Sequence, residues 1–284
     1  MATATTLTPL EHHVIRELRE WEINEANLLV AVSGGLDSTV LLYILKRISP
    51  LLKLKVYAAH IHHGWIHGPQ GDFRDRAWHF VRKTCQKWEV PFYSNLLEAR
   101  PKYRFHREPH QTLKSEEQMR KFRYECLYEY RQQITDSLNR KTFIVLAHNA
   151  NDLLETRLMR LIRGTGSLGL LAMSTLGEDL LRPLLQMDRN VLADYAKSYG
   201  LQFLEDPSNA SPDPFRNWIR HEWLPLLEAK RPGSGQSLAR SLDQLLGIET
   251  NTMNVEEIFA GEGINLQLFL ELSPAQKKQI LAQY

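Results

Sequence analysis

The residues best suited to chemistry stand at Ser33–Ser38, where the sequence reads SGGLDS directly after an apolar run. Gly34 and Gly35 lack a Cβ atom, so the backbone can turn tightly and a ligand can approach it closely. A turn that leads into a helix also presents unpaired N–H groups, which favour an anion. The two serines add hydroxyl donors, and Asp37 adds a carboxylate of the kind that binds Mg²⁺. These residue types predict a loop that cradles phosphate groups.

The turn differs from two commoner phosphate-binding loops. It has neither the Gly-Lys-Ser/Thr of a Walker loop nor the glycine spacing of a dinucleotide-binding turn. SGGxDS after a strand instead resembles the pyrophosphate (PP) loop of the N-type ATP pyrophosphatases, which cleave ATP to AMP and pyrophosphate. An ordinary glycine-rich connection is the alternative. The resemblance implies Mg²⁺ held by Asp37 and ATP held by Ala31, Ser33, Gly34, Gly35, Leu36, Asp37 and Ser38.

A histidine-rich segment, HIHHGW at His60–Trp65, follows the next expected strand. In a doubly wound sheet this strand neighbours the first, so we expect His60 to emerge beside the loop and contact the nucleotide. A metal site is the alternative, because several histidines lie close together. No carboxylate–histidine spacing typical of zinc accompanies them.

An expected helix carries Glu116, Arg120, Arg123 and Tyr124 on one face. Arginine suits phosphate because its planar fork donates two hydrogen bonds and keeps its charge. The alternative is a surface pair between Glu116 and Arg120, and spacing alone slightly favours that pair.

Another charged group follows the strand expected at Thr142–Ala147. His148, Asp152 and Glu155 have the spacing i, i+4 and i+7, which would place an imidazole and two carboxylates on one face. Carboxylates also stabilise a helix N-terminus by capping. Three ionisable groups at the end of a strand exceed what capping needs, so we favour a functional role.

The sequence predicts that strands and helices alternate along the chain and position these groups. The expected strands are Leu28–Val32, Lys55–His60, Phe92–Leu96 and Thr142–Ala147, and the expected helices are Thr39–Ile48, Asp72–Trp88, Ser115–Thr135, Asp152–Ile162, Asp188–Tyr199 and Phe215–Lys230. A polar connection lies at Arg100–Leu113. The alternation predicts an α/β fold with a doubly wound parallel sheet, Rossmann-like and of the adenine nucleotide alpha hydrolase type. Its ligand should bind at the carboxyl ends of the strands.

The length and composition of the chain limit its possible domains, partners and metal sites. The 284 residues are enough for one large domain at 1–230 and a small helical C-terminal domain at 231–284, joined near Arg231–Gly235. The net charge is only +2, so any nucleic-acid footprint must be local. The two cysteines, Cys85 and Cys126, are far apart, which fits a reducing cytoplasm and weighs against a thiolate metal site. We expect neither a signal peptide nor a membrane span.

Taken in order, these motifs resemble the tRNA(Ile)-lysidine synthetases from Leu28 to about Leu227. Besides the PP loop, the resemblance rests on His60-x-x-His63-Gly64, the Arg120–Tyr124 segment, and His148-x-x-x-Asp152-x-x-Glu155. It continues through Leu158–Gly164, Arg182-Pro-Leu-Leu, Asp206-Pro-Ser-Asn, Arg216-Asn217 and Arg220.

The resemblance implies a reaction that uses ATP, Mg²⁺ and free L-lysine on a tRNA(Ile) with a CAU anticodon. ATP adenylates O2 of the wobble cytidine (position 34), lysine attacks C2, and AMP leaves. Asp37, His148 and Asp152 would be catalytic, and His60 and Arg120 would join the ATP site. Asp152 and Glu155 would bind lysine, and Arg123, Arg163, Arg216, Asn217 and Arg220, with the C-terminal domain, would bind tRNA. A homodimer is compatible with the resemblance.

The chain departs from the family pattern at two places. Trp65-Ile66 replace the usual Leu-Arg, and Asn151 replaces a carboxylate. Two alternatives therefore stay open: another PP-loop adenylating enzyme, such as a tRNA thiolase or a small-molecule synthetase, or a non-catalytic protein that binds ATP or RNA. Thiolases of this kind usually carry Cys-x-x-Cys pairs, which this sequence lacks.

Overall fold

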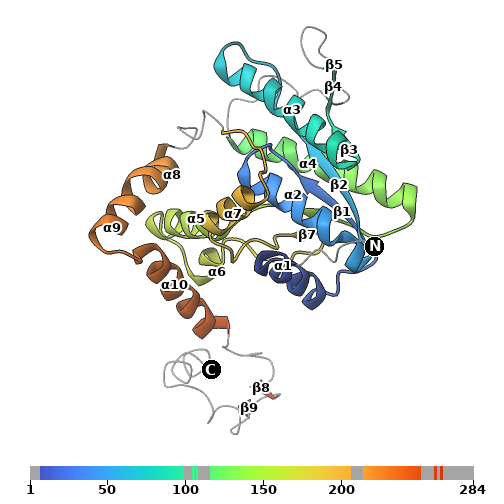
Figure 1. Cartoon of the computed structure of the whole chain (residues 1–284). Helices are drawn as coiled ribbons and strands as arrows, with labels where there is room; N and C mark the ends of the chain where they lie inside the picture. Colours follow the sequence, from blue (N-terminus) through green and yellow to red (C-terminus); the bar gives the residue numbers. More distant parts are fainter. Residues whose placement is uncertain are drawn as a thin grey trace. The chain divides into compact units, whose positions relative to one another are not determined.

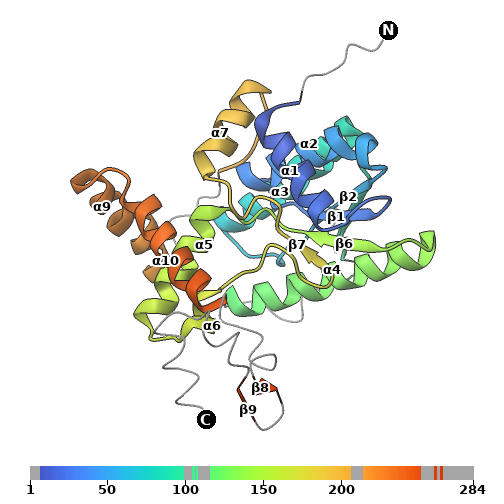
Figure 2. The same ribbon diagram turned by 90° about the horizontal axis from the view of Figure 1, so that it is seen from below.

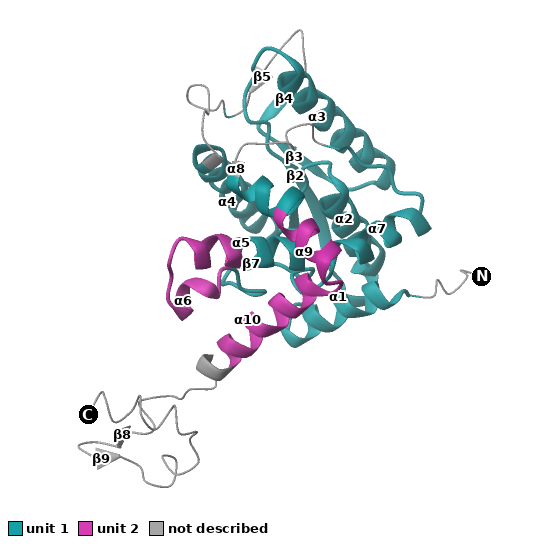
Figure 3. Ribbon diagram, turned by 90° about the vertical axis from the view of Figure 1, so that its left-hand side faces the viewer, with its two compact units in different colours: residues 1–156, 173–222 teal, residues 157–172, 223–284 magenta. Residues whose placement is uncertain are grey.

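The computed structural model describes residues 7–98, 104–105, 107, 116–205, 214–250, 259–260 and 263–264. The chain divides into two compact units, residues 1–156 with 173–222 and residues 157–172 with 223–284 (Figure 3). The first unit contains a five-stranded sheet in the order β3-β2-β1-β6-β7, in which every neighbouring pair is parallel. Its strands are β1 (Asn27–Ala31), β2 (Lys55–His60), β3 (Phe92–Ser94), β6 (Thr142–Val145) and β7 (Leu180–Leu181).

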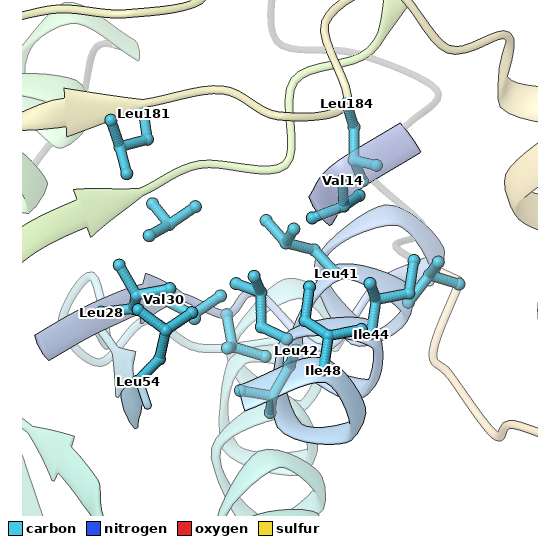
Figure 4. Close-up of a cluster of buried hydrophobic side chains, with 14 of the residues drawn as sticks. Val14, Leu28, Val30, Leu41, Leu42, Ile44, Ile48, Leu54, Leu181 and Leu184 are labelled. Carbon is cyan, nitrogen blue, oxygen red and sulfur yellow. The ribbon is translucent and has the colours of Figure 1, made fainter. Parts of the chain in front are cut away.

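Helices cover both faces of this sheet because the central strand is apolar on both sides. Leu28 and Val30 of β1 belong to a core (Figure 4) that also holds side chains of α1 (Pro9–Glu20), α2 (Leu36–Ile48), α3 (Pro69–Trp88) and α7 (Arg189–Ser198). Leu29 belongs to the opposite core, with side chains of α4 (Glu116–Leu138). Figures 1 and 2 show α4 across the sheet from α1 and α2. The predicted doubly wound α/β fold is confirmed.

The strand order creates a natural place for a ligand. β1 pairs with β2 on one side and with β6 on the other. The connections that leave β1 and β6 therefore diverge at their carboxyl ends, and such a switch point is where ligands bind in open α/β sheets. The SGGLDS turn follows β1 and His148 follows β6, so the topology brings the two predicted groups to the same edge.

Several elements differ from the sequence prediction. The helix expected from Thr39 begins at Leu36, because Gly35 in extended conformation serves as its N-cap. The strand expected at Phe92–Leu96 is divided between β3 and β4 (Leu96–Glu98), which pairs with β5 (Arg104–Phe105) in a separate sheet. The helix expected at Phe215–Lys230 is interrupted: α8 (Pro214–Trp218) is followed by a π-helical turn (Ile219–Trp223) and α9 (Leu224–Lys230). The Asp206–Asn209 motif and most of the Arg100–Leu113 connection lie outside the described residues.

The second unit contains the end of α5 (Ala150–Ile162), α6 (Ser167–Leu170), α9 and α10 (Ser234–Thr250), with a short hairpin of β8 (Phe259–Ala260) and β9 (Gly263–Ile264). Arg157 ties this unit together, since its guanidinium donates to Asp243 (2.7 Å) and to the Leu170 carbonyl (3.1 Å). α10 begins at Ser234, inside the expected linker, and the domain boundary at residue 230 stays a prediction. No helix in the described part of the chain is long and apolar enough to cross a membrane.

Candidate active site

The SGGLDS turn closes on itself through its two serines. Gly35 N–H donates to Ser33 Oγ (3.3 Å), and Ser33 N–H donates to Ser38 Oγ (3.2 Å). The two hydroxyl oxygens lie 3.1 Å apart, and Ser38 Oγ–H donates to the Gly35 carbonyl (3.1 Å). The hydroxyls therefore hold the shape of the loop. Within the part of the chain that the structure describes, no side chain caps α2, so the N–H groups of its first turn stay available to an anion.

Gly34 is the position in this loop that only glycine fills well. Its φ is +94°, and a Cβ atom there would lie 3.3 Å from Val81 Cγ2. Its carbonyl accepts a hydrogen bond from Leu204 N–H (2.9 Å), which ties the loop to the chain after α7. A side chain at Gly34 would combine backbone strain with a close contact.

Asp37 is on the first turn of α2 and has the properties of a cation ligand. Its Oδ1 is buried and accepts no hydrogen bond within the described residues, while Arg189 Nε lies 3.7 Å away. Burial raises the pKa of Asp37 to about 6, against the opposing effect of Arg189. No group of three or more His, Cys, Asp or Glu side chains among the described residues could enclose a metal. One carboxylate plus substrate phosphates is, however, a common way to bind Mg²⁺, so the site fits that ion.

Three histidines at the ends of β2 and β6 (His60, His63 and His148) are here called the site histidines. Burial lowers the pKa of His60 to about 4 and the pKa of His63 to about 3. Burial, followed by the charges of Arg182, Arg123, Arg120 and Arg216, lowers the pKa of His148 to about 3. All three are therefore neutral at physiological pH. His62, in contrast, is buried against Asp75, with Nε2 and Oδ1 3.1 Å apart.

Arg120 and Arg123 lie over the Tyr124 ring, with their guanidinium carbons 5.2 and 5.6 Å from its centroid. Since both charges act on His148, α4 directs cations toward the end of β6. Phosphate groups favour such an environment. Glu116 begins α4, but its side chain is outside the described residues.

The two predicted carboxylates are engaged by two arginines from α8 and the π-helical turn. Glu155 accepts from Arg220 Nε (2.6 Å), Arg220 Nη2 (2.7 Å) and Arg216 Nε (3.0 Å). Asp152 accepts from Arg220 Nη2 (3.1 Å), and its other oxygen accepts from Asn149 N–H (3.2 Å). The spacing argument is therefore right that Asp152 and Glu155 act together. It is wrong about His148, which precedes α5 and hydrogen-bonds to Arg182.

Two predicted tRNA-binding residues remain. Asn217 Nδ2 is buried and has no hydrogen-bond partner within the described residues. Arg163 is exposed and belongs to the second unit.

Sequence reasoning assigned no role to three residues that complete the site, namely Asn149, Arg182 and Arg189. Asn149 caps α5, because its Oδ1 accepts from the N–H groups of Asn151 and Asp152. Asn151 Oδ1 accepts from Arg189 N–H (3.0 Å), which links α5 to the start of α7. Arg182 carried a signal, the Arg-Pro-Leu-Leu motif, whereas Arg189 carried none.

A GxGxxG sequence at Gly164–Gly169 also went unnoticed. It follows α5 and runs into the four-residue α6, so it lacks the strand that a dinucleotide site requires.

Comparison with known proteins agrees with this geometry. Residues 10–227 match the PP-loop domain family. A tRNA(Ile)-lysidine synthase of Bdellovibrio bacteriovorus is 36% identical over 280 residues, which cover 97% of this chain and 82% of that protein. The enzymes of the same name from Thermotoga maritima and Nitrosomonas europaea are 38% and 30% identical over 72% and 99% of this chain. The chain spans 46% and 60% of those two proteins, or about half their length.

The fold also matches a solved structure. The U34-tRNA thiolase NcsA from Methanococcus maripaludis, with its [4Fe-4S] cluster, aligns over 84% of this chain and 78% of its own, with a TM-score of 0.61 and 19% identity. That likeness concerns the fold alone. The assignment rests on the family match and on the similarity to a lysidine synthase over 97% of this chain: this chain belongs to the tRNA(Ile)-lysidine synthase family of PP-loop proteins.

Proposed function

We propose that this protein joins L-lysine to C2 of the wobble cytidine of a tRNA(Ile) with a CAU anticodon, with ATP cleaved to AMP and pyrophosphate. The main observation behind this proposal is the start of α2, where no side chain caps the helix within the described residues. It follows the SGGLDS turn and lies at the switch point of the sheet. The chain belongs to a family whose members are named for lysidine synthesis. The start of a helix at this position suits an anion, and pyrophosphate is the anion that the first step releases.

In that first step, O2 of the cytidine attacks the α-phosphate of ATP and pyrophosphate departs. The N–H groups of the first turn of α2 stabilise the negative charge that develops on the leaving group. Arg120 and, across the site, Arg189 contribute positive charge. His60 donates its Nδ1–H to the Val32 carbonyl (2.8 Å), so its Nε2 is left to accept from an amino or hydroxyl group of the nucleotide.

Asp37 is the residue we assign to Mg²⁺, because its buried Oδ1 accepts no hydrogen bond within the described residues. The ion, when bound, would spread the charge of the phosphates.

In the second step the ε-amine of lysine attacks C2, the C2–O bond to AMP breaks, and the proton that the amine loses passes to solvent. We assign the ammonium group of the incoming lysine to Asp152, whose side chain is 19% exposed, whereas that of Glu155 is 3% exposed. Glu155 acts on the lysine site mainly through Arg216 and Arg220. It accepts hydrogen bonds from both arginines and so keeps them beside Asp152. A direct contact between Glu155 and lysine stays a prediction.

The tRNA contacts are proposals of the same kind. Arg123, Arg163, Asn217 and the residues after Gly235 are candidates for phosphate and base contacts, and Arg216 and Arg220 could join them only by sharing the carboxylates. Chemistry on a ring atom of one base requires that base to leave its stack. Since the proposed substrates are tRNA, ATP and free lysine, we expect the protein to act in the cytoplasm. The predicted homodimer is tested by sedimentation.

A thiolase activity is the alternative that the fold allows. Both cysteines are free and buried, one on α3 and one on α4, and burial raises the pKa of each thiol to about 12. Such thiols are poor nucleophiles and poor metal ligands. The lysidine reaction therefore fits these residues better.

The decisive experiment incubates the protein with ¹⁴C-lysine, ATP and tRNA(Ile) transcripts that carry either cytidine or uridine at position 34. We expect label in the cytidine transcript only, with one AMP and one pyrophosphate released per lysine. AMP release without transfer of lysine would support a different adenylating enzyme. Binding of ATP without any turnover would support a non-catalytic protein.

A further inference from the structure

Arg182 and His148 meet at the carboxyl ends of two paired strands, β7 and β6. Arg182 Nε donates to His148 Nδ1 over 3.2 Å, and Arg182 Nη1 donates to the Ser174 carbonyl over 2.8 Å. The guanidinium is thus anchored on one side to the chain before β7 and presented on the other to the imidazole. This contact joins residues 34 positions apart.

The chemistry of the two groups fixes the direction of the hydrogen bond. A guanidinium carries only donors, so His148 Nδ1 must accept and its lone pair is occupied. The largest charge effects on His148 come from cations, namely Arg182 after β7, Arg123 and Arg120 from α4, and Arg216 from α8. They oppose protonation of the ring, as burial does. A neutral imidazole with Nδ1 as acceptor carries its hydrogen on Nε2.

His60 has the opposite arrangement at the end of β2. Its Nδ1 faces the Val32 carbonyl, which can only accept, so this ring carries hydrogen on Nδ1. His148 Nε2 has no hydrogen-bond partner among the residues described. The two rings therefore offer a ligand one acceptor and one donor.

We propose that Arg182 is a positioning residue that fixes His148 as the Nε2–H tautomer, so that His148 donates a hydrogen bond to the substrate and does not act as a general base. The acceptor has the chemistry of a phosphate or carbonyl oxygen. This role of His148 in turnover rests on the proposed function, whereas the tautomer does not. With its Nδ1 lone pair engaged and its Nε2 protonated, His148 has no site for the proton that lysine loses.

The tautomer is tested by ¹⁵N NMR of protein labelled at histidine, with the His148 signals identified by their loss in His148→Gln. We expect a neutral Nε2–H ring between pH 5 and 8. In Arg182→Met we expect mixed tautomers and a pKa that moves up toward the ordinary value of about 6.5. An Nδ1–H ring in the unaltered protein, or an unchanged ring in Arg182→Met, would overturn the proposal. If Arg182→Met does not fold, the unaltered protein still decides the proposal, because an Nδ1–H ring there overturns it.

The role in turnover is tested by two substitutions of His148. Glutamine places an amide N–H near the position of Nε2 but cannot take a proton, whereas alanine supplies neither. If His148 only donates, His148→Gln should keep kcat within about 10-fold of the unaltered enzyme, while His148→Ala loses about 100- to 1000-fold, the cost of one such donor. Equal losses in both variants would show that a base has been removed. If the unaltered protein transfers no lysine, the proposed function fails and the NMR result still decides the role of Arg182.

Discussion

Replacing Glu155 by Gln tests the central claim about the carboxylate cluster. The Glu155 side chain is 3% exposed and accepts three hydrogen bonds from Arg216 and Arg220, between 2.6 and 3.0 Å. Glutamine keeps the size but removes the charge, and one of its two terminal atoms becomes a donor that faces a donor. The two guanidinium groups then keep Asp152 as a carboxylate partner but lose the charge of Glu155.

The expected cost follows from this geometry. Removing one partner of a buried ion pair costs about 3–5 kcal/mol. The side chains of Arg216 and Arg220 are 29% and 24% exposed, so water can partly replace the lost acceptor. We therefore expect a loss of about 3 kcal/mol, at the lower end of that range. For a unit of this size such a loss lowers Tm by about 6–12 °C.

Thermal and urea unfolding give both numbers, and Glu222→Gln is a matched control. Glu222 is in the π-helical turn that carries Arg220 but is exposed, so its substitution should change stability by less than about 0.5 kcal/mol. A loss below about 1 kcal/mol in Glu155→Gln, relative to this control, would refute the view that Glu155 holds the two arginines. In the same samples the KM for lysine should rise more than the KM for ATP.

Three other predictions follow from single contacts. Gly34→Ala and Gly200→Ala both place a side chain at positive φ and should each lose about 1–2 kcal/mol. Only Gly34→Ala should also weaken ATP binding, and equal ATP affinities measured by calorimetry would contradict this. Asn151→Ala removes the acceptor for Arg189 N–H and should weaken ATP binding about fivefold, the equivalent of one hydrogen bond. Asn151→Asp keeps this acceptor and should keep the ATP affinity. Equal ATP affinities in the two variants would count against a role of this hydrogen bond in ATP binding. Because the folded state lowers the pKa of the site histidines, their stabilising effect is complete above about pH 6.5 and is lost as the pH falls toward 4. Urea titrations between pH 7 and 4 should show this slope, and a flat profile would mean that these rings are not buried.

The scaffold could be predicted from sequence because its signals are local. An apolar run before SGGLDS predicted β1 to within one residue at each end, and the alternation of elements predicted the parallel sheet. α1 was not predicted, although Thr8 and Glu11 form a capping box and the helix is amphipathic. β7 was also missed, because two residues are too few to show a period.

The site was predictable only where its parts lie near one another in the sequence. Spacing along α5 correctly paired Asp152 with Glu155, but it could not identify their partners, which lie 61 to 68 residues away. Burial of a carboxylate requires a counter-charge, yet no local pattern says which arginine supplies it. The same limit explains the error for His148. Its spacing predicted that it shares a helix face with Asp152 and Glu155, whereas in the structure it precedes α5 and accepts a hydrogen bond from Arg182. Local spacing therefore cannot tell whether a carboxylate and an imidazole form an acid–base pair or are each neutralised by arginines. The topology of the sheet determines this, because the arrangement at the switch point between β1 and β6 determines which distant arginines contact each carboxylate and each imidazole.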